Sequence, residues 1–162
     1  MRQEFAYNRS RLVGSLFLGL AAAFVVFLLL FGVMMIALLP SLCVLGLFLL
    51  FVIVSLGSPL WTAHVLTGDV LHIRYGLVLW TKVKAGDIAS VEETGSRPLM
   101  EGVTFSVRGR VLYVTTEPRN LVAIRLREKR RFPAALWKSA DTIVLSLSEP
   151  RRFVTELEKL LS

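Results

Sequence analysis

The sequence predicts an α+β membrane protein, in which a hairpin of two transmembrane helices is followed by a small, basic, mostly β domain. The 162-residue chain carries no Asp, Glu, Lys or Arg between Arg11 and Asp69. After that stretch, short runs of alternating apolar and polar residues are separated by turn residues, which is the pattern of antiparallel strands. We therefore divide the chain into a basic N-terminus (1–11), a helical hairpin (12–57) and a β domain (58–162).

The uncharged run at residues 12–56 is long enough for two membrane crossings, because about 20 apolar residues span the hydrocarbon core. Pro40 and Ser41 form the best break between the two helices, since both residues are favoured at a helix start. A signal peptide has a shorter apolar core and a small-residue cleavage site. A buried helix of a soluble protein is also shorter, so two transmembrane helices remain the favoured interpretation.

The distribution of Lys and Arg predicts the orientation, because these residues concentrate on the cytoplasmic side. Arg2, Arg9 and Arg11 precede the first helix, and the other sixteen Lys and Arg residues follow the second. An even number of crossings keeps both basic flanks on one side. We expect a multi-pass protein of the inner (plasma) membrane with both termini in the cytoplasm.

Small residues on one face of the first helix predict how the hairpin packs. Ser15, Gly19 and Ala23 are spaced four apart, and Gly46 of the second helix would face them. Small residues at this spacing let two helices approach closely. Packing within the hairpin is the simpler interpretation, and dimerisation through the same stripe is the alternative. The single cysteine, Cys43, lies inside the apolar run and is expected to be a packing residue.

The remainder of the chain predicts seven or so short strands and one helix. Strands are expected on both sides of a turn at Gly68 and Asp69, and then at 77–83, 88–94, 103–107, 111–116, 121–127 and 142–147. Strands of this length argue for an antiparallel sandwich or small barrel. Ser148 or Glu149 can cap a final helix that has Pro150 in its first turn. Its apolar stripe, made by Phe153, Leu157, Leu160 and Leu161, should cover an edge of the sheet.

The sequences of several segments resemble those of the bacterial pleckstrin-homology (PH)-like domains. The segments are LHIRYGLVLW at 71–80, VKAGDIASVE at 83–92, PRNLVAIRLRE at 118–128 and LSLSEPRRF at 145–153. The resemblance covers roughly residues 60–162 and implies a PH-like β-sandwich or barrel with a C-terminal helix. It implies no particular ligand, because one fold serves many functions.

No group of residues in the sequence predicts an active site. Pairing around Gly68 and Asp69 places His64 and His72 on opposite faces of a sheet, because successive strand residues point apart. Glu92 and Glu93 are adjacent on one strand and therefore diverge for the same reason. Nucleophile motifs, glycine-rich phosphate loops and paired metal-ligand motifs are missing from the sequence. We expect a protein that is not an enzyme and has no cofactor or metal.

A basic segment near residue 130 is the most distinctive polar feature. The candidate residues for binding lipid or another anion are Arg125, Arg127, Lys129, Arg130, Arg131 and Lys138. The segment is either a solvated loop or a contact with acidic lipids, which attract juxtamembrane cations. Trp61, Phe132 and Trp137 are the candidate membrane-interface residues. Nucleic acid is disfavoured as a partner, because no spaced aromatic platform or recognition helix accompanies the charge.

These observations lead to one main functional hypothesis and two alternatives. The main hypothesis is a non-catalytic, membrane-anchored scaffold whose β domain recruits a protein partner, or a second copy of the chain, at the cytoplasmic face. The first alternative is a sensor of anionic lipid headgroups that uses residues 125–131. A small membrane enzyme is the second and weaker alternative. Membrane lipids are expected partners under either of the first two hypotheses.

Overall fold

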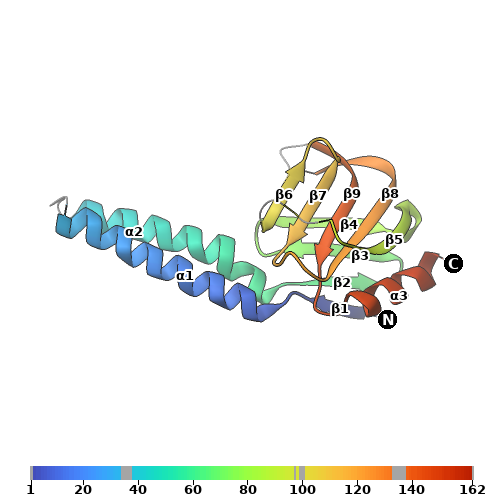
Figure 1. Ribbon diagram of the computed structural model, residues 1–162, viewed down its shortest axis with the longest axis horizontal. Coiled ribbons are helices and arrows are strands. Elements are labelled where there is room, and N and C mark those ends of the chain that lie inside the picture. The colour runs from blue at the N-terminus through green and yellow to red at the C-terminus, as the bar shows by residue number, and fades with distance from the viewer. Residues whose placement is uncertain (1, 34–37, 97, 99–100, 133–137, 162) are drawn as a thin grey trace.

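Two apolar helices project side by side from a β domain of two sheets, and a short C-terminal helix packs on the domain at its other end (Figure 1). This computed structural model describes residues 2–33, 38–96, 98, 101–132 and 138–161, without the side chains of 9–11 and 33. The architecture confirms an α+β chain with a helical hairpin, a β domain and a C-terminal helix.

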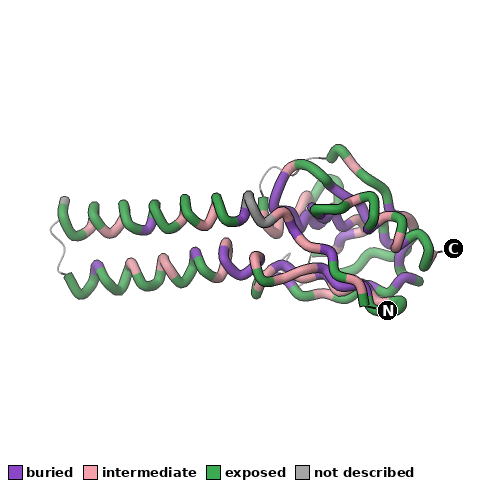
Figure 2. The backbone as a smooth tube through the Cα atoms, turned by 90° about the horizontal axis from the view of Figure 1, so that it is seen from below, coloured by how far each residue is buried: buried purple, intermediate pink, exposed green. Residues whose placement is uncertain are grey.

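The helices of the hairpin expose most of their surface. Helix α1 (Arg9–Leu28) continues through the π-helical turn η1 (Leu29–Val33). Helix α2 (Leu38–Val52) continues through η2 (Ile53–Gly57) and the 3₁₀ turn η3 (Ser58–Trp61). The apolar segments Leu12–Gly32 and Leu38–Trp61 are each long and apolar enough to cross a membrane, and in each the most apolar stretch of 18 residues is only 11% buried (Figure 2). They therefore do not form the core of the β domain.

The second helix begins earlier than the sequence predicted. It starts at Leu38, which places Pro40 within its first turn rather than before it. Proline is tolerated there because the first N–H groups of a helix have no partner within the helix. The four residues before Leu38 lie outside the described part of the chain.

Residues at the N-terminus form a strand of the first sheet. Strand β1 (Arg2–Ala6) pairs antiparallel with β2 (Ala63–Thr67) along its whole length, from Arg2 opposite Thr67 to Ala6 opposite Ala63. The helical hairpin is therefore an insertion between two neighbouring strands. Both ends of the hairpin therefore lie next to the β domain.

The first sheet has the order β1-β2-β3-β4, with β3 at Val70–Tyr75 and β4 at Leu79–Lys84. Val65 lies opposite His72 and Leu66 opposite Leu71, which confirms the predicted turn at Gly68 and Asp69. The inner face carries Leu71, Ile73, Tyr75, Leu79 and Val83, all of them buried.

The second sheet has the order β5-β8-β9-β7-β6 and is mixed, not purely antiparallel as predicted. A 3₁₀ turn, η4 (Ala85–Asp87), leads from the first sheet into it, and its strands are β5 (Ile88–Thr94), β6 (Gly102–Ser106), β7 (Val111–Thr115), β8 (Leu121–Phe132) and β9 (Lys138–Ser146). Strand β9 lies parallel to β7 and antiparallel to β8. The parallel pair arises because β9 returns between β7 and β8, an arrangement that local patterns do not encode.

Helix α3 (Pro150–Leu161) joins the edge strands of the two sheets. Phe153 is fully buried and meets Phe5 of β1 edge to face, with ring centroids 4.9 Å apart. Gln3 of β1 donates a hydrogen bond to Glu156, and α3 also packs against β5. The predicted role of this helix in covering a sheet edge is therefore confirmed, and it covers two edges, because β1 and β5 each have only one neighbouring strand.

Candidate functional site

The basic segment is a strand, not a loop, and its side chains are dispersed. Strand β8 runs to Phe132, and its pairing with β9 is irregular between Arg125 and Arg130. Arg125 forms an exposed ion pair with Glu92 at 3.0 Å, and exposed pairs of this kind contribute at most about 1 kcal/mol. Lys138 lies 5.6 Å from the centre of the Phe105 ring. These two cations are therefore engaged elsewhere and do not share a site with the rest of the segment.

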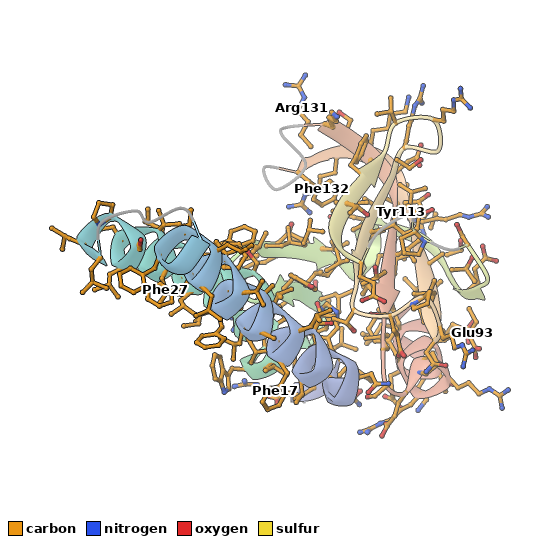
Figure 3. All side chains as sticks on the ribbon, turned by 60° about the vertical axis from the view of Figure 1, so that its left-hand side comes forward. Phe17, Phe27, Glu93, Tyr113, Arg131 and Phe132 are labelled. Atoms are coloured by element: carbon orange, nitrogen blue, oxygen red, sulfur yellow. The ribbon has the colours of Figure 1, made fainter. Side chains whose placement is uncertain are left out.

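The predicted membrane-interface residues also separate. Arg131 points out from the domain, whereas its neighbour Phe132 is fully buried in the core (Figure 3). Phe132 is thus unavailable to a membrane surface, which corrects the prediction, because alternation along β8 turns it inward. Trp137 lies outside the described residues. Trp61 is 78% exposed at the end of the second helix.

A cleft of about 510 Å³ opens between the end of β4 and the bent part of β8. Its walls combine residues from both sheets and from the η4 turn between them. The lining residues are Val70, Lys82, Val83, Lys84, Gly86, Asp87, Leu126, Arg127, Glu128, Lys129 and Arg130. Five of these side chains are cationic and two are carboxylates, so the cleft has an excess of positive charge and we call it the basic cleft.

Hydrogen bonds to backbone carbonyls hold the two walls of the basic cleft in place. The Ala85 N–H donates to the Asp69 carbonyl at 2.7 Å, which fixes η4 against the β2–β3 turn. Arg127 Nε donates to the Ile88 carbonyl at 3.1 Å, which ties β8 to the start of β5. Val83 and Leu126 are buried and supply apolar surface at the base. A ligand with negative charge and some apolar surface would match this lining.

Three of the six predicted anion-binding residues, Arg127, Lys129 and Arg130, line the basic cleft, and β4 adds Lys82 and Lys84. The sequence offered a weak signal for the lysines, since TKVK alternates charged and apolar residues at the end of a strand. The segment that lies opposite Lys82 and Lys84 depends on how the two sheets stack. It is residues 126–130 of β8, more than forty residues away in the chain, so local sequence patterns do not reveal it.

The lining of the basic cleft consists of charged and apolar residues and Gly86, and it contains no Ser, Thr, Cys, His or Tyr side chain. Within the described ranges, no group of three His, Cys, Asp or Glu residues is positioned to hold a metal ion.

The two histidines lie on opposite faces of the first sheet, as the predicted register requires. His72 is on the outer face, where burial and then the charges of Lys82, Arg74 and Arg2 lower its pKa. His64 is completely buried, and its Nδ1 accepts the Arg74 backbone N–H at 3.3 Å. Its ring meets Tyr7 edge to face at 4.7 Å. His64 and His72 therefore lie in different environments and cannot bind the same ligand.

Acid is expected to destabilise the protein through His64. Burial lowers its pKa from 6.5 to about 3, so between these values the unfolded state binds a proton that the folded state does not. The stabilisation is present above pH 6.5 and is lost as the pH falls, by up to about 1.4 kcal/mol per pH unit. Urea unfolding of the detergent-solubilised chain between pH 7 and pH 5 measures this slope. His64→Gln should reduce the slope of the unfolding free energy against pH, while His72→Gln should retain most of that slope. Equal slopes in the wild type and both variants would contradict the assignment of the pH dependence to His64.

The helix-packing residues are only partly brought together. A Cβ at Gly19 would lie 3.0 Å from Leu56 Cδ1 and 3.1 Å from Val52 Cγ1, so the helices approach closely there. Ala23 is 1% exposed and Ser15 is half-buried. Gly46 has no atom within 4 Å of a Cβ position and does not face the first helix, contrary to the prediction. Val52 and Leu56 take that place because they follow Gly46 toward the base of the hairpin.

Comparison with known proteins identified no relative of this chain. No protein-family model matches the chain, and neither the curated proteins nor the solved structures give a match.

Proposed function

We propose that this chain is a non-enzymatic, membrane-anchored binding protein whose basic cleft takes an acidic segment of a protein partner. In this proposal the hairpin crosses the inner membrane of a bacterial cell, and a PH-like β domain faces the cytoplasm. The observation that carries the proposal is the cleft itself, with five cations against two carboxylates.

The surface of the hairpin supports membrane anchoring. Phe17, Leu18, Leu39 and Leu47 are each 68–73% exposed, and Figure 3 shows Phe17 and Phe27 standing out from α1. Exposed apolar surface of this extent is unfavourable in water and favourable in lipid. The pairing of β1 with β2 keeps both ends of the hairpin beside one β domain, which supports an even number of crossings, in agreement with the basic residues on both flanks.

The position of the basic cleft favours a protein partner over the lipids of the anchoring membrane. The strands of the first sheet run roughly along the hairpin direction, and the η4 turn lies at the end of the domain away from the hairpin (Figure 1). Lys84 is five residues beyond Leu79 on β4, or roughly 17 Å at 3.3 Å per residue. Electrostatic attraction to a membrane surface is largely screened beyond about 8–10 Å. A soluble acidic segment has no such restriction.

The test uses the full chain in nanodiscs of zwitterionic lipid and a fluorescent poly-glutamate peptide as the probe. Peptide affinity should fall steeply with added salt. The triple variant Lys84→Gln, Lys129→Gln, Arg130→Gln should lose most of the binding. The matched control Arg108→Gln, Arg110→Gln, Arg119→Gln removes the same charge from exposed positions outside the cleft and should retain it. Equal losses in both variants would mean that net charge, not the cleft, attracts the peptide.

The same nanodiscs distinguish the lipid-sensing alternative. If the cleft reads lipid headgroups, replacing part of the zwitterionic lipid by phosphatidylglycerol should displace the peptide from the unmodified chain. Under the protein-partner proposal, the bound fraction of peptide changes little, because the cleft lies away from the membrane surface.

A further inference from the structure

Four large apolar side chains are exposed where the hairpin meets the β domain. Trp61 ends the second helix, Leu77 and Val78 form the β3–β4 turn, and Trp80 lies on β4. Their exposed fractions are 78%, 79%, 44% and 68%. We call these residues the basal patch. Exposed apolar groups of this size gathered at one end of a domain are typical of an interaction surface.

Hydrogen bonds fix the height of the basal patch relative to the second helix. The Leu77 N–H donates to Ser58 Oγ at 3.1 Å, and the Gly76 N–H donates to Thr62 Oγ1 at 3.0 Å. Ser58 Oγ in turn donates to the carbonyl of Val54, inside the apolar segment. The turn is thus tied to the last residues of the segment Leu38–Trp61. If that segment crosses a membrane, the turn lies at the boundary between acyl chains and headgroups.

Positive charge surrounds the aromatic part of the patch. Arg74 Cζ lies 5.1 Å and Lys82 Nζ 5.9 Å from the centre of the Trp80 ring. Neither cation forms an ion pair with a carboxylate in the part of the chain that the structure describes. Tryptophan beside unpaired Lys and Arg is the combination that favours the interface of an anionic membrane.

We infer that the basal patch rests on the anionic lipid surface of the membrane that the hairpin crosses. Leu77 and Val78 enter the acyl boundary, Trp80 lies among the headgroups, and Arg74 and Lys82 face the lipid phosphates. A lipid surface fits better than a protein partner because the patch is continuous with the apolar base of the hairpin. The inference rests on the proposed anchoring of the hairpin, and its surface shares only Lys82 with the basic cleft.

This contact would hold the β domain at a set height and tilt. Trp80 is next to the β3–β4 turn, whereas Thr67 lies on the same outer face at the opposite end of the sheet, paired with Val70 and through it with Lys84. Only the near end of the sheet then reaches lipid. Lys84 and the β8 residues of the basic cleft are kept at the far end, open to the solvent.

The experiment measures tryptophan quenching in the full chain, reconstituted in phosphatidylcholine–phosphatidylglycerol nanodiscs. Trp61→Phe with Trp137→Phe leaves Trp80 as the reporter. Lipids brominated near the headgroup end of their acyl chains should remove most of the Trp80 emission, and aqueous acrylamide should remove little. Thr67→Trp, in a chain whose three native tryptophans are replaced by Phe, is the matched control on the same sheet face. Its emission should be lost to acrylamide and not to brominated lipid.

A fourth reporter separates this inference from the anchoring on which it rests. Phe24→Trp, in the same tryptophan-free background, places the probe on an exposed position of α1, and lipids brominated deep in the acyl chain should quench it. If Phe24→Trp is quenched while Trp80 responds to acrylamide alone, the basal contact is wrong and the anchoring stands. Protection of Trp80 from both quenchers would also overturn the inference, in favour of a covering protein. Loss of quenching at Phe24→Trp would overturn the anchoring and the inference together.

Tryptophan quenching in the same nanodiscs also tests the role of Arg74 and Lys82. Arg74→Gln with Lys82→Gln should shift Trp80 from brominated lipid toward acrylamide, and the shift should be larger with phosphatidylglycerol than without it. Arg108→Gln with Arg110→Gln is the control of equal charge. An identical response in the two variants would overturn the assignment of Arg74 and Lys82 to lipid phosphates.

Discussion

A chain truncated to residues 58–162 is expected to lose its fold, although those residues include every strand that the sequence predicted. The truncation removes β1, whose Phe5 is 3% exposed, and Tyr7, which is 2% exposed. Loss of a buried aromatic side chain costs about 3–5 kcal/mol. Two such losses approach the whole stability of a domain, about 5–15 kcal/mol.

Contacts from α3 and β3 are lost with the same segment. Phe153 loses its edge-to-face partner Phe5, and Ser148 loses the Ala6 carbonyl, to which both its N–H and its hydroxyl donate. The Tyr7 hydroxyl donates to the Arg74 carbonyl at 2.5 Å, so β3 loses a partner as well. Removing β1 also leaves β2 as an unpaired edge, which favours aggregation.

The matched chain keeps β1 and removes the helices instead. Residues 14–57 are replaced by a short Gly-Ser linker, which is geometrically feasible because a Cβ at Gly57 would lie 3.8 Å from Leu16 Cδ1. This hairpin-deleted chain should be soluble and should unfold cooperatively, as measured by circular dichroism and by dispersed amide resonances. The 58–162 fragment should show neither property. Equal thermal midpoints for the two chains would mean that β1 contributes nothing to the domain.

The difference between these two chains reflects what local sequence can and cannot reveal. Strand β5 and the helix beginning at Pro150 were predictable because their apolar period, turn residues and cap lie within a dozen residues. Strand β1 is only five residues long and half polar, and its partner β2 is separated from it by the entire hairpin. Whether β1 joins the sheet depends on tertiary pairing with β2. In the sequence, its Arg2 indicated only a basic flank on the cytoplasmic side of the first helix.

The candidate site shows the same division. The positive charge of residues 125–131 was evident in the sequence, but the segment continues β8 as a strand, so alternate side chains diverge and Phe132 enters the core. The lysines of β4 and the exposed Trp80 became meaningful only once the stacking of the sheets and the docking of the β3–β4 turn were known. The sequence shows the charge, and the fold determines which charged side chains lie together.

Replacing Gly76 by alanine is expected to destabilise the full chain far more than the same change at Gly68. Both glycines have left-handed backbone conformations, with φ of +52° at Gly76 and +57° at Gly68. An alanine in that conformation costs about 1–2 kcal/mol. A Cβ at Gly68 meets nothing within 4 Å, whereas one at Gly76 overlaps Ser58 Oγ and lies 2.9 Å from Pro59 N. Overpacking of this kind adds about 1–3 kcal/mol.

The physical reason is that the Gly76 turn is where the β domain touches the base of the second helix. Because Pro59 N is backbone, it cannot rotate away as a flexible side chain would, so the turn must separate from η3 and give up the bond from Leu77 to Ser58. Urea unfolding in detergent should therefore rank the wild type above Gly68→Ala and Gly68→Ala above Gly76→Ala. Ser58→Gly removes the overlapping hydroxyl and Cβ, so it should lessen the effect of Gly76→Ala and give a coupling of about 0.5–3 kcal/mol in the double-mutant cycle. If the two alanine variants were equally stable, the domain and the hairpin would not be in contact at this turn, and the fixed height of the β domain above the helices would have no structural basis.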